Sequence, residues 1–155
     1  TVVREYAASY REAVTQSALD LGRVEAAAAA VDALAAALMA DLGNATTRKG
    51  IDQARRDAQK FYDHDYLELY HLATLLQKYC PAEAIRTAAQ GVLDTIQPAG
   101  QASLVLEAKS VGSTMAESHG VSIYFPDDRV SPAYAGLAMS TATRWDEFLE
   151  KYRTA

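Results

Sequence analysis

The stretch from His119 to Pro126, with the sequence HGVSIYFP, constrains the fold more than any other part of the chain. Its apolar residues recur at every second position, which is typical of a strand with one face on a core. A glycine opens the run and a proline closes it, as expected where backbone pairing stops. The segments before it have helical periodicity and need a surface to pack on. We therefore expect a strand around which helices assemble.

The length and composition predict one globular domain. The chain has 155 residues, of which 50% are apolar and 23% are charged. Its net charge of −5 argues against a nucleic-acid partner, which would require a basic surface. Two basic pairs, Arg48-Lys49 and Arg55-Arg56, alternate with acidic residues and are interpreted as a solvated helix face. No apolar run is suited to a membrane span, and the single cysteine cannot form an internal disulfide.

Two parts are expected along the chain. Residues 1–20 form an N-terminal segment with a short helix, Val2 to Tyr10, and a strand over 13–19. Residues 21–155 form the main helical domain. Because the sequence starts with threonine and shows no signal sequence, we expect a fragment or a processed product, and interpret the first segment as a remnant of, or link to, an upstream domain.

Apolar periodicity and helix breakers predict a bundle of about five to seven helices. The longest is an alanine-rich helix over 21–42 with a continuous apolar stripe, expected at the centre because few charges are available for an outer face. Further helices are expected after caps at Thr46 or Thr47, after Asp65 up to Tyr79, from Pro81 to Ile96, and after Thr143.

Two short alternating runs predict the only sheet. Residues 103–109 form one strand and residues 120–125 the other, joined by a loop of small residues. Neighbouring strands with such a connection usually form a β-hairpin. The predicted fold class is therefore mainly α, a helical bundle with one small hairpin, 103–109 with 120–125.

Cys80 and His119 are the first candidates for catalysis. A cysteine nucleophile needs a nearby base, and histidine is the usual one. However, Cys80 lies before a proline at a helix end, and buried cysteines are common core residues. Nothing in the sequence around it indicates an oxyanion hole or a lowered thiol pKa. We therefore interpret Cys80 as a buried core residue and not as a nucleophile.

Glu68 and His71 are the second candidate, because residues three apart share a helix face and this spacing occurs in carboxylate-bridged iron bundles. Such sites need two copies of the motif, and the chain has one. Asp63, His64 and Asp65 are nearby potential ligands, but adjacent side chains point in different directions. No catalytic, cofactor-binding or metal-binding residue is therefore assigned, and the residue pattern alone predicts a mainly helical domain with a hairpin.

Several blocks together resemble the C-terminal part of the clostripain family of cysteine peptidases. The most specific is the closing strand with the final helix, in which the family has "Gly-x-Ser-Ile-Tyr-Phe-Pro" and then "Thr-x-Trp-x-x-Phe-Leu". The similarity extends over most of the following blocks: 14–21, running into the long helix; 66–73; 118–126; Tyr134; Leu137; 143–149; and Tyr152.

The resemblance implies that the intact protein is a bacterial, caspase-like α/β endopeptidase that cleaves after basic residues with a Cys–His dyad. It implies a secreted or cell-surface location, use of calcium, and self-cleavage into two chains. The family's catalytic His-Gly and its Asp-x-Cys lie upstream of everything seen here, and no Asp-x-Cys occurs in this sequence. His119-Gly120 belongs to the closing strand and Cys80 is not the nucleophile. No catalytic residue and no cofactor is assigned to this chain, and its own status as an enzyme is left open.

The resemblance makes this chain a non-catalytic helical domain that supports or covers an upstream catalytic domain acting on protein substrates. In the family, the strand over 14–19 would join the catalytic sheet. Without that sheet its edge is expected to be unpaired, so we expect 13–19 to be disordered, helical, or paired with another copy of the chain. Two alternatives remain: a stand-alone helical protein-interaction module without a peptidase partner, and a metal-binding bundle.

Overall fold

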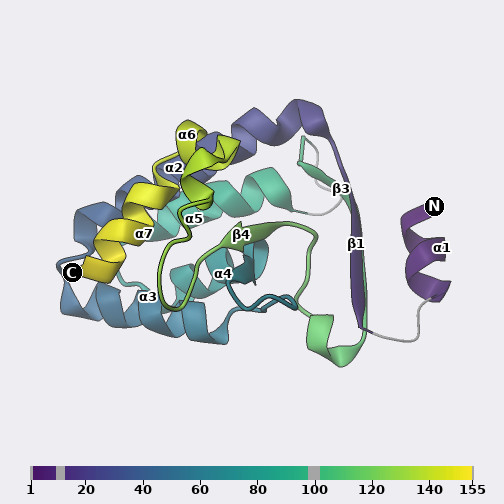
Figure 1. The fold of residues 1–155 in the computed structure, drawn as a ribbon, viewed down its shortest axis with the longest axis horizontal. Helices are drawn as coiled ribbons and strands as arrows, with labels where there is room; N and C mark the ends of the chain where they lie inside the picture. Colours follow the sequence, from purple (N-terminus) through teal and green to yellow (C-terminus); the bar gives the residue numbers. More distant parts are fainter. Residues whose placement is uncertain (1, 10–12, 98–101, 155) are drawn as a thin grey trace.

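The structure, a computed structural model, describes residues 2–9, 13–97 and 102–154. Within these residues it is mainly α-helical, which confirms the predicted fold class (Figure 1). The helices are α1 (Val2–Ser9), α2 (Val24–Asp41), α3 (Ala45–Asp57), α4 (Leu69–Tyr79), α5 (Glu83–Ile96), α6 (Ala138–Ala142) and α7 (Trp145–Thr154). The strands are β1 (Val14–Leu19), β2 (Tyr66–Glu68), β3 (Val105–Val111) and β4 (Ser122–Tyr124).

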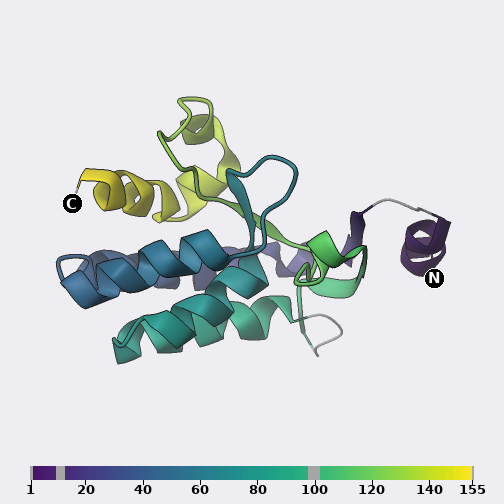
Figure 2. The ribbon, with the colours of Figure 1, turned by 90° about the horizontal axis from the view of Figure 1, so that it is seen from below.

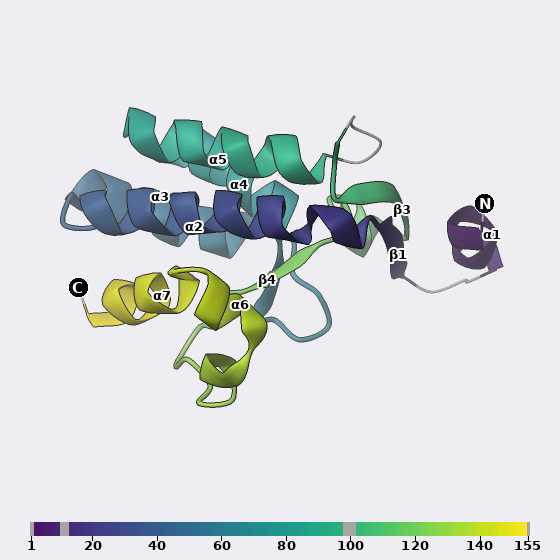
Figure 3. The same ribbon diagram turned by 90° about the horizontal axis from the view of Figure 1, so that it is seen from above.

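The helices lie in three layers. In the views from below and from above, α2 and α3 occupy the middle layer, α4 and α5 lie on one side of it, and α6 and α7 lie on the other (Figures 2 and 3). The predicted central position of the alanine-rich helix is confirmed, since α2 packs on α5 and on α7. Small side chains allow this close approach from both sides. Among the described helices, none combines the length and hydrophobicity that crossing a bilayer requires.

The strands do not form the predicted hairpin of 103–109 with 120–125. Instead β3 pairs with β1, and β4 pairs with β2, each antiparallel. A third extended stretch continues the second sheet, because Phe61 N donates to Tyr66 O and Glu68 N donates to Gln59 O. The prediction assumed that strands close in sequence pair with one another, and here each takes a partner from much earlier in the chain.

The strand over 14–19 is present but is not unpaired. It forms a ribbon with β3 from Val14 opposite Val111 to Leu19 opposite Val105, with an irregularity after Ala18. The prediction that this segment is disordered, helical or paired with a second copy was therefore wrong, because β3 of the same chain supplies the hydrogen-bonding partner. Pairing with another copy is not needed to satisfy this edge of the strand.

Gly120 is required where the β1–β3 ribbon meets the helical body. Its φ is +111°, in the region that favours glycine, and an added Cβ would lie 2.7 Å from Cβ of Ser17. Ser17 Oγ donates to Gly120 O at 2.9 Å, which fixes this contact. The glycine that opens the closing strand therefore lets two sheets approach closely.

Two helix starts differ from the sequence prediction. The side chain of Asn44, rather than Thr46 or Thr47, caps α3 by accepting from Thr46 N. Asp65 does not start α4, because Tyr66–Glu68 forms β2 first and Glu68 becomes the N-cap. The sheet hydrogen bonds at β2 outweigh the helical preference of these residues.

An aromatic core joins the closing strand to the last helix. Phe125 meets Trp145 and Phe148 edge-on, and Trp145 Nε1 donates to Tyr124 O at 2.7 Å. Arg55 is also buried, with 7% of its surface exposed, and donates to Phe125 O from Nε and Nη2 and to the Asp127 carboxylate. The interpretation of Arg55 as part of a solvated face was therefore wrong, since it anchors the end of the closing strand.

Candidate functional site

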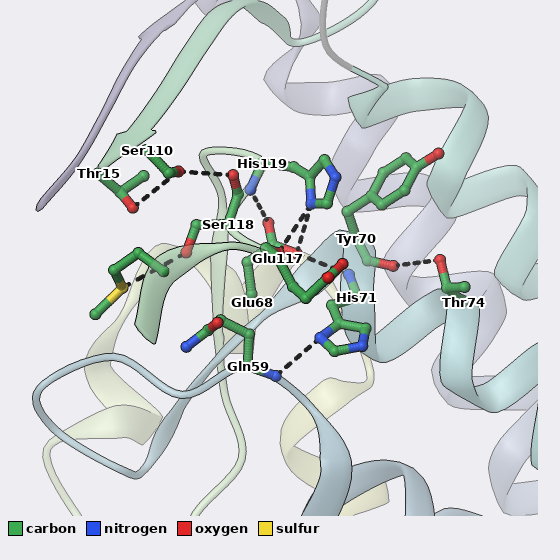
Figure 4. A network of polar contacts seen from close by, with 11 residues as sticks. Thr15, Gln59, Glu68, Tyr70, His71, Thr74, Ser110, Glu117, Ser118 and His119 are labelled. Atoms are coloured by element: carbon green, nitrogen blue, oxygen red, sulfur yellow. Dashed lines mark hydrogen bonds and ion pairs between the residues drawn. The ribbon is translucent and has the colours of Figure 1, made fainter. Parts of the chain in front are cut away.

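Glu68 is unusual among the described residues, because it carries a carboxyl group and its surface is 0% exposed. It ends β2 and begins α4, so the change from strand to helix places its side chain over the first turn of the helix (Figure 4). Oε2 accepts from His71 N at 2.7 Å and Oε1 accepts from His119 N at 3.1 Å. Two backbone donors thus stabilise a carboxylate that burial would otherwise penalise.

His119 completes this site. Its Nδ1 lies 3.5 Å from Glu68 Oε2 and 2.9 Å from Glu117 O, and its ring stacks on Tyr70 with centroids 4.4 Å apart. The side-chain contact with Glu68 raises the pKa of His119, against the opposing effect of partial burial. The residues that the sequence treated as separate candidates, Glu68 and His119, are therefore one carboxylate–imidazole pair.

The predicted Glu68–His71 face is not arranged as a metal site. His71 Nδ1 accepts from Gln59 N at 3.1 Å, and both Glu68 oxygens are engaged with backbone donors. Asp63 accepts from Asp65 N within its own turn. Across residues 2–9, 13–97 and 102–154, no three histidine, cysteine, aspartate or glutamate side chains converge as metal ligands would.

Cys80 lies far from His119. Cys80 is the C-cap of α4, whereas Glu68, which holds His119, is the N-cap of the same helix. The two caps are separated by the eleven residues of α4, which corresponds to roughly 18 Å along the helix axis. Burial raises the pKa of the Cys80 thiol to about 11, with a further contribution from Asp41. Cys80 and His119 cannot act as a dyad in this arrangement, and the thiol stays protonated at neutral pH.

The β1–β3 ribbon is the second candidate site. Among the described strands, β1 has β3 as its one neighbour, so its opposite edge is unpaired. In an antiparallel pair, half of the peptide groups point away from the partner strand. The ribbon stands at one end of the helical layers, with α1 beyond it (Figures 1 and 3). This edge is a main-chain surface to which another strand can be added.

One polar atom on this ribbon has no partner in the described structure. Oε1 of Gln16 is buried and meets no hydrogen-bond donor. Gln16 lies opposite Lys109 on β3, and Glu107 on the same strand pairs with Arg4 of α1. The side of the ribbon toward α1 is therefore polar, and it includes one acceptor whose hydrogen-bonding capacity is unused.

The sequence did not indicate the buried network around Glu68. The residue was interpreted as the acid three positions after an Asp65 cap, in the first turn of the helix. The one nearby sequence signal is the glycine after His119, where the positive φ lets the chain turn into the closing strand. A single glycine is too common to predict such a contact.

Comparisons of the chain with protein-family models, with curated proteins and with solved structures found no match.

Proposed function

We propose that this chain is the non-catalytic C-terminal helical domain of a clostripain-like cysteine endopeptidase. Its role is to support or cover an upstream caspase-like catalytic domain that cleaves proteins after basic residues. The resemblance of the closing strand and final helix to that family motivates the proposal. The observation that carries it is the unpaired edge of β1, which offers a place for the last strand of another sheet.

The arrangement of Cys80 and His119 agrees with a supporting role. The one cysteine is buried, has a raised thiol pKa and lies at the far end of α4 from the histidine. The Glu68–His119 pair serves instead to hold Gly120 and the start of β4 against α4. In the proposed enzyme, the nucleophile and its base come from the upstream domain, together with any calcium that the enzyme uses.

The alternative is a stand-alone helical module that binds other proteins without a peptidase partner. The same unpaired strand edge would then receive a strand from an unrelated protein. The two proposals differ in what lies next to β1 in the cell: a covalently or closely associated peptidase sheet in the first, and a separate binding partner in the second. The metal-binding bundle has no supporting observation in the described residues.

The experiment compares hydrolysis of an arginyl-coumarin substrate by this chain alone and by the polypeptide extended upstream along its reading frame, with and without calcium. Activity only in the extended protein is the expected result. An extended protein without activity toward basic substrates would contradict the proposal. Activity in the short chain that is lost in Cys80→Ala would also contradict it, because the nucleophile would then be Cys80.

A further inference from the structure

The outer edge of β4 carries main-chain groups without partners. Leu69 N donates to Val121 O and Phe125 N donates to Asp65 O, so the odd-numbered residues of this stretch bond to β2. The backbone N–H and C=O groups of the even-numbered residues must then point away from β2. At Tyr124 the carbonyl accepts from Trp145 Nε1, but the Tyr124 N–H and both groups of Ser122 meet no partner in the described structure.

An apolar groove of about 310 Å³ borders the same edge. Its lining residues come mainly from α2, from β4 and from the segment that leads into α6. Figure 3 shows how these three parts of the backbone are arranged. None of its lining residues is charged. Its rim is formed by three side chains that are unusually exposed for apolar residues, Val24 at 46%, Tyr66 at 38% and Leu137 at 49%. Exposed apolar surface around a groove of this kind is typical of an interaction site.

We propose that this groove and the edge of β4 together bind an extended peptide segment of a partner protein by strand addition. The unpaired N–H groups of Ser122 and Tyr124 and the Ser122 carbonyl indicate what binds here. The backbone of a second extended segment satisfies them, and an apolar small molecule does not. An antiparallel strand forms two hydrogen bonds with Ser122 and one with the Tyr124 N–H. Trp145, already bonded to the Tyr124 carbonyl, limits how far the added strand extends.

The chemistry of the groove sets the side-chain preference. An added strand points alternate side chains to one face, so one of them enters the groove beside Ala28 and Val31. Because no lining residue is charged, the groove should prefer an aliphatic or aromatic side chain at that position. The flanking residues of the peptide point away from the groove and tolerate polar groups. This inference is independent of the proposed peptidase role, since it concerns β4 rather than the edge of β1.

The test uses fluorescein-labelled, blocked hexapeptides that alternate threonine with one apolar residue: alanine, valine, leucine, isoleucine or phenylalanine. Binding to the whole chain is followed by fluorescence anisotropy. Ser122→Pro removes the outward N–H without touching the bonds to β2, and Ser122→Ala is its matched control. Ala28→Phe fills the groove from a half-buried position on α2. Circular dichroism establishes that each variant is folded.

The expected result is binding of at least one peptide, weakened by about tenfold or more in Ser122→Pro and in Ala28→Phe and unchanged within about twofold in Ser122→Ala. A peptide with N-methyl groups on the edge facing β4 should lose binding to a similar extent. Failure of every peptide to bind the wild-type chain would overturn the proposal. The proposal would also be overturned if the N-methylated peptide bound the wild type as tightly as the unmodified peptide does. The same holds if the unmodified peptide bound Ser122→Pro as tightly as the wild type, because the groove would then bind an apolar group without strand addition.

Discussion

Glu68 and His119 form a pair whose charge state depends on pH. A buried carboxylate and a histidine with a raised pKa stabilise the fold most when the imidazole is protonated. The contribution is fully present below the ordinary histidine pKa of about 6.5 and is lost as the pH rises through the higher folded value. The pair is therefore a stability element that weakens toward alkaline pH, located where β4 approaches α4.

His119→Gln tests this at the residue scale. The variant keeps the backbone N–H that Glu68 accepts but removes the titrating ring. The wild type should exceed the variant in free energy of unfolding by more at about pH 5.5 than at about pH 8.5, as measured by urea denaturation. A difference that is constant with pH, or that grows as the pH rises, would show that the Glu68 contact does not raise the pKa of His119.

At the element scale, sequence patterns predicted where most helices and strands lie, but not which strands pair with each other. The runs over 14–19, 103–109 and 120–125 all contain strands, because alternation is a local property. Pairing is not local: β1 and β3 are brought together by the helices between them, and no alternation pattern reports that. The burial of Arg55 was missed for the same reason, since its carbonyl acceptor at Phe125 is 70 residues away.

Contacts between helices α3 and α4 allow a matched pair of substitutions. Gly50 lies inside α3, and an added Cβ would be 2.5 Å from Tyr79 O and 3.1 Å from Cys80 Sγ. Gly50→Ala should therefore destabilise the fold by about 1–3 kcal/mol although alanine favours a helix. Gly91, inside α5, has no atom within 4 Å of its added Cβ, so Gly91→Ala should stabilise the fold by roughly 0.5–1 kcal/mol.

Urea denaturation of the two variants measures both changes. Opposite signs are the expected result, because the substitution is identical and only the neighbouring backbone differs. If Gly50→Ala were as stable as Gly91→Ala, then α3 and α4 would not approach as closely as the structure shows. The buried environment of Cys80, which lies at this contact, would then also need revision.

At the scale of the whole molecule, a layered helical body carries two strand edges with different surroundings. The edge of β1 lies on a ribbon beside α1, away from the helical layers, and the edge of β4 lies beside an apolar groove. The open edge of β4 was not predicted, because 103–109 was expected to pair with 120–125. An unpaired edge was expected for 14–19, but its pairing with β3 was not. The candidate sites of this chain are therefore the two strand edges. Sequence patterns could not predict them, because which edges stay open depends on the tertiary arrangement.

Amide hydrogen exchange along β1, residues 14–19, is the most direct test of the proposed role of this chain. In the chain alone, amides that bond to β3 should be protected and the outward ones, about half, should exchange rapidly. In the polypeptide extended upstream, the outward amides should become protected as well, because the catalytic sheet would pair with this edge. Unchanged rapid exchange of the outward amides in the extended polypeptide would contradict a role in completing a peptidase sheet.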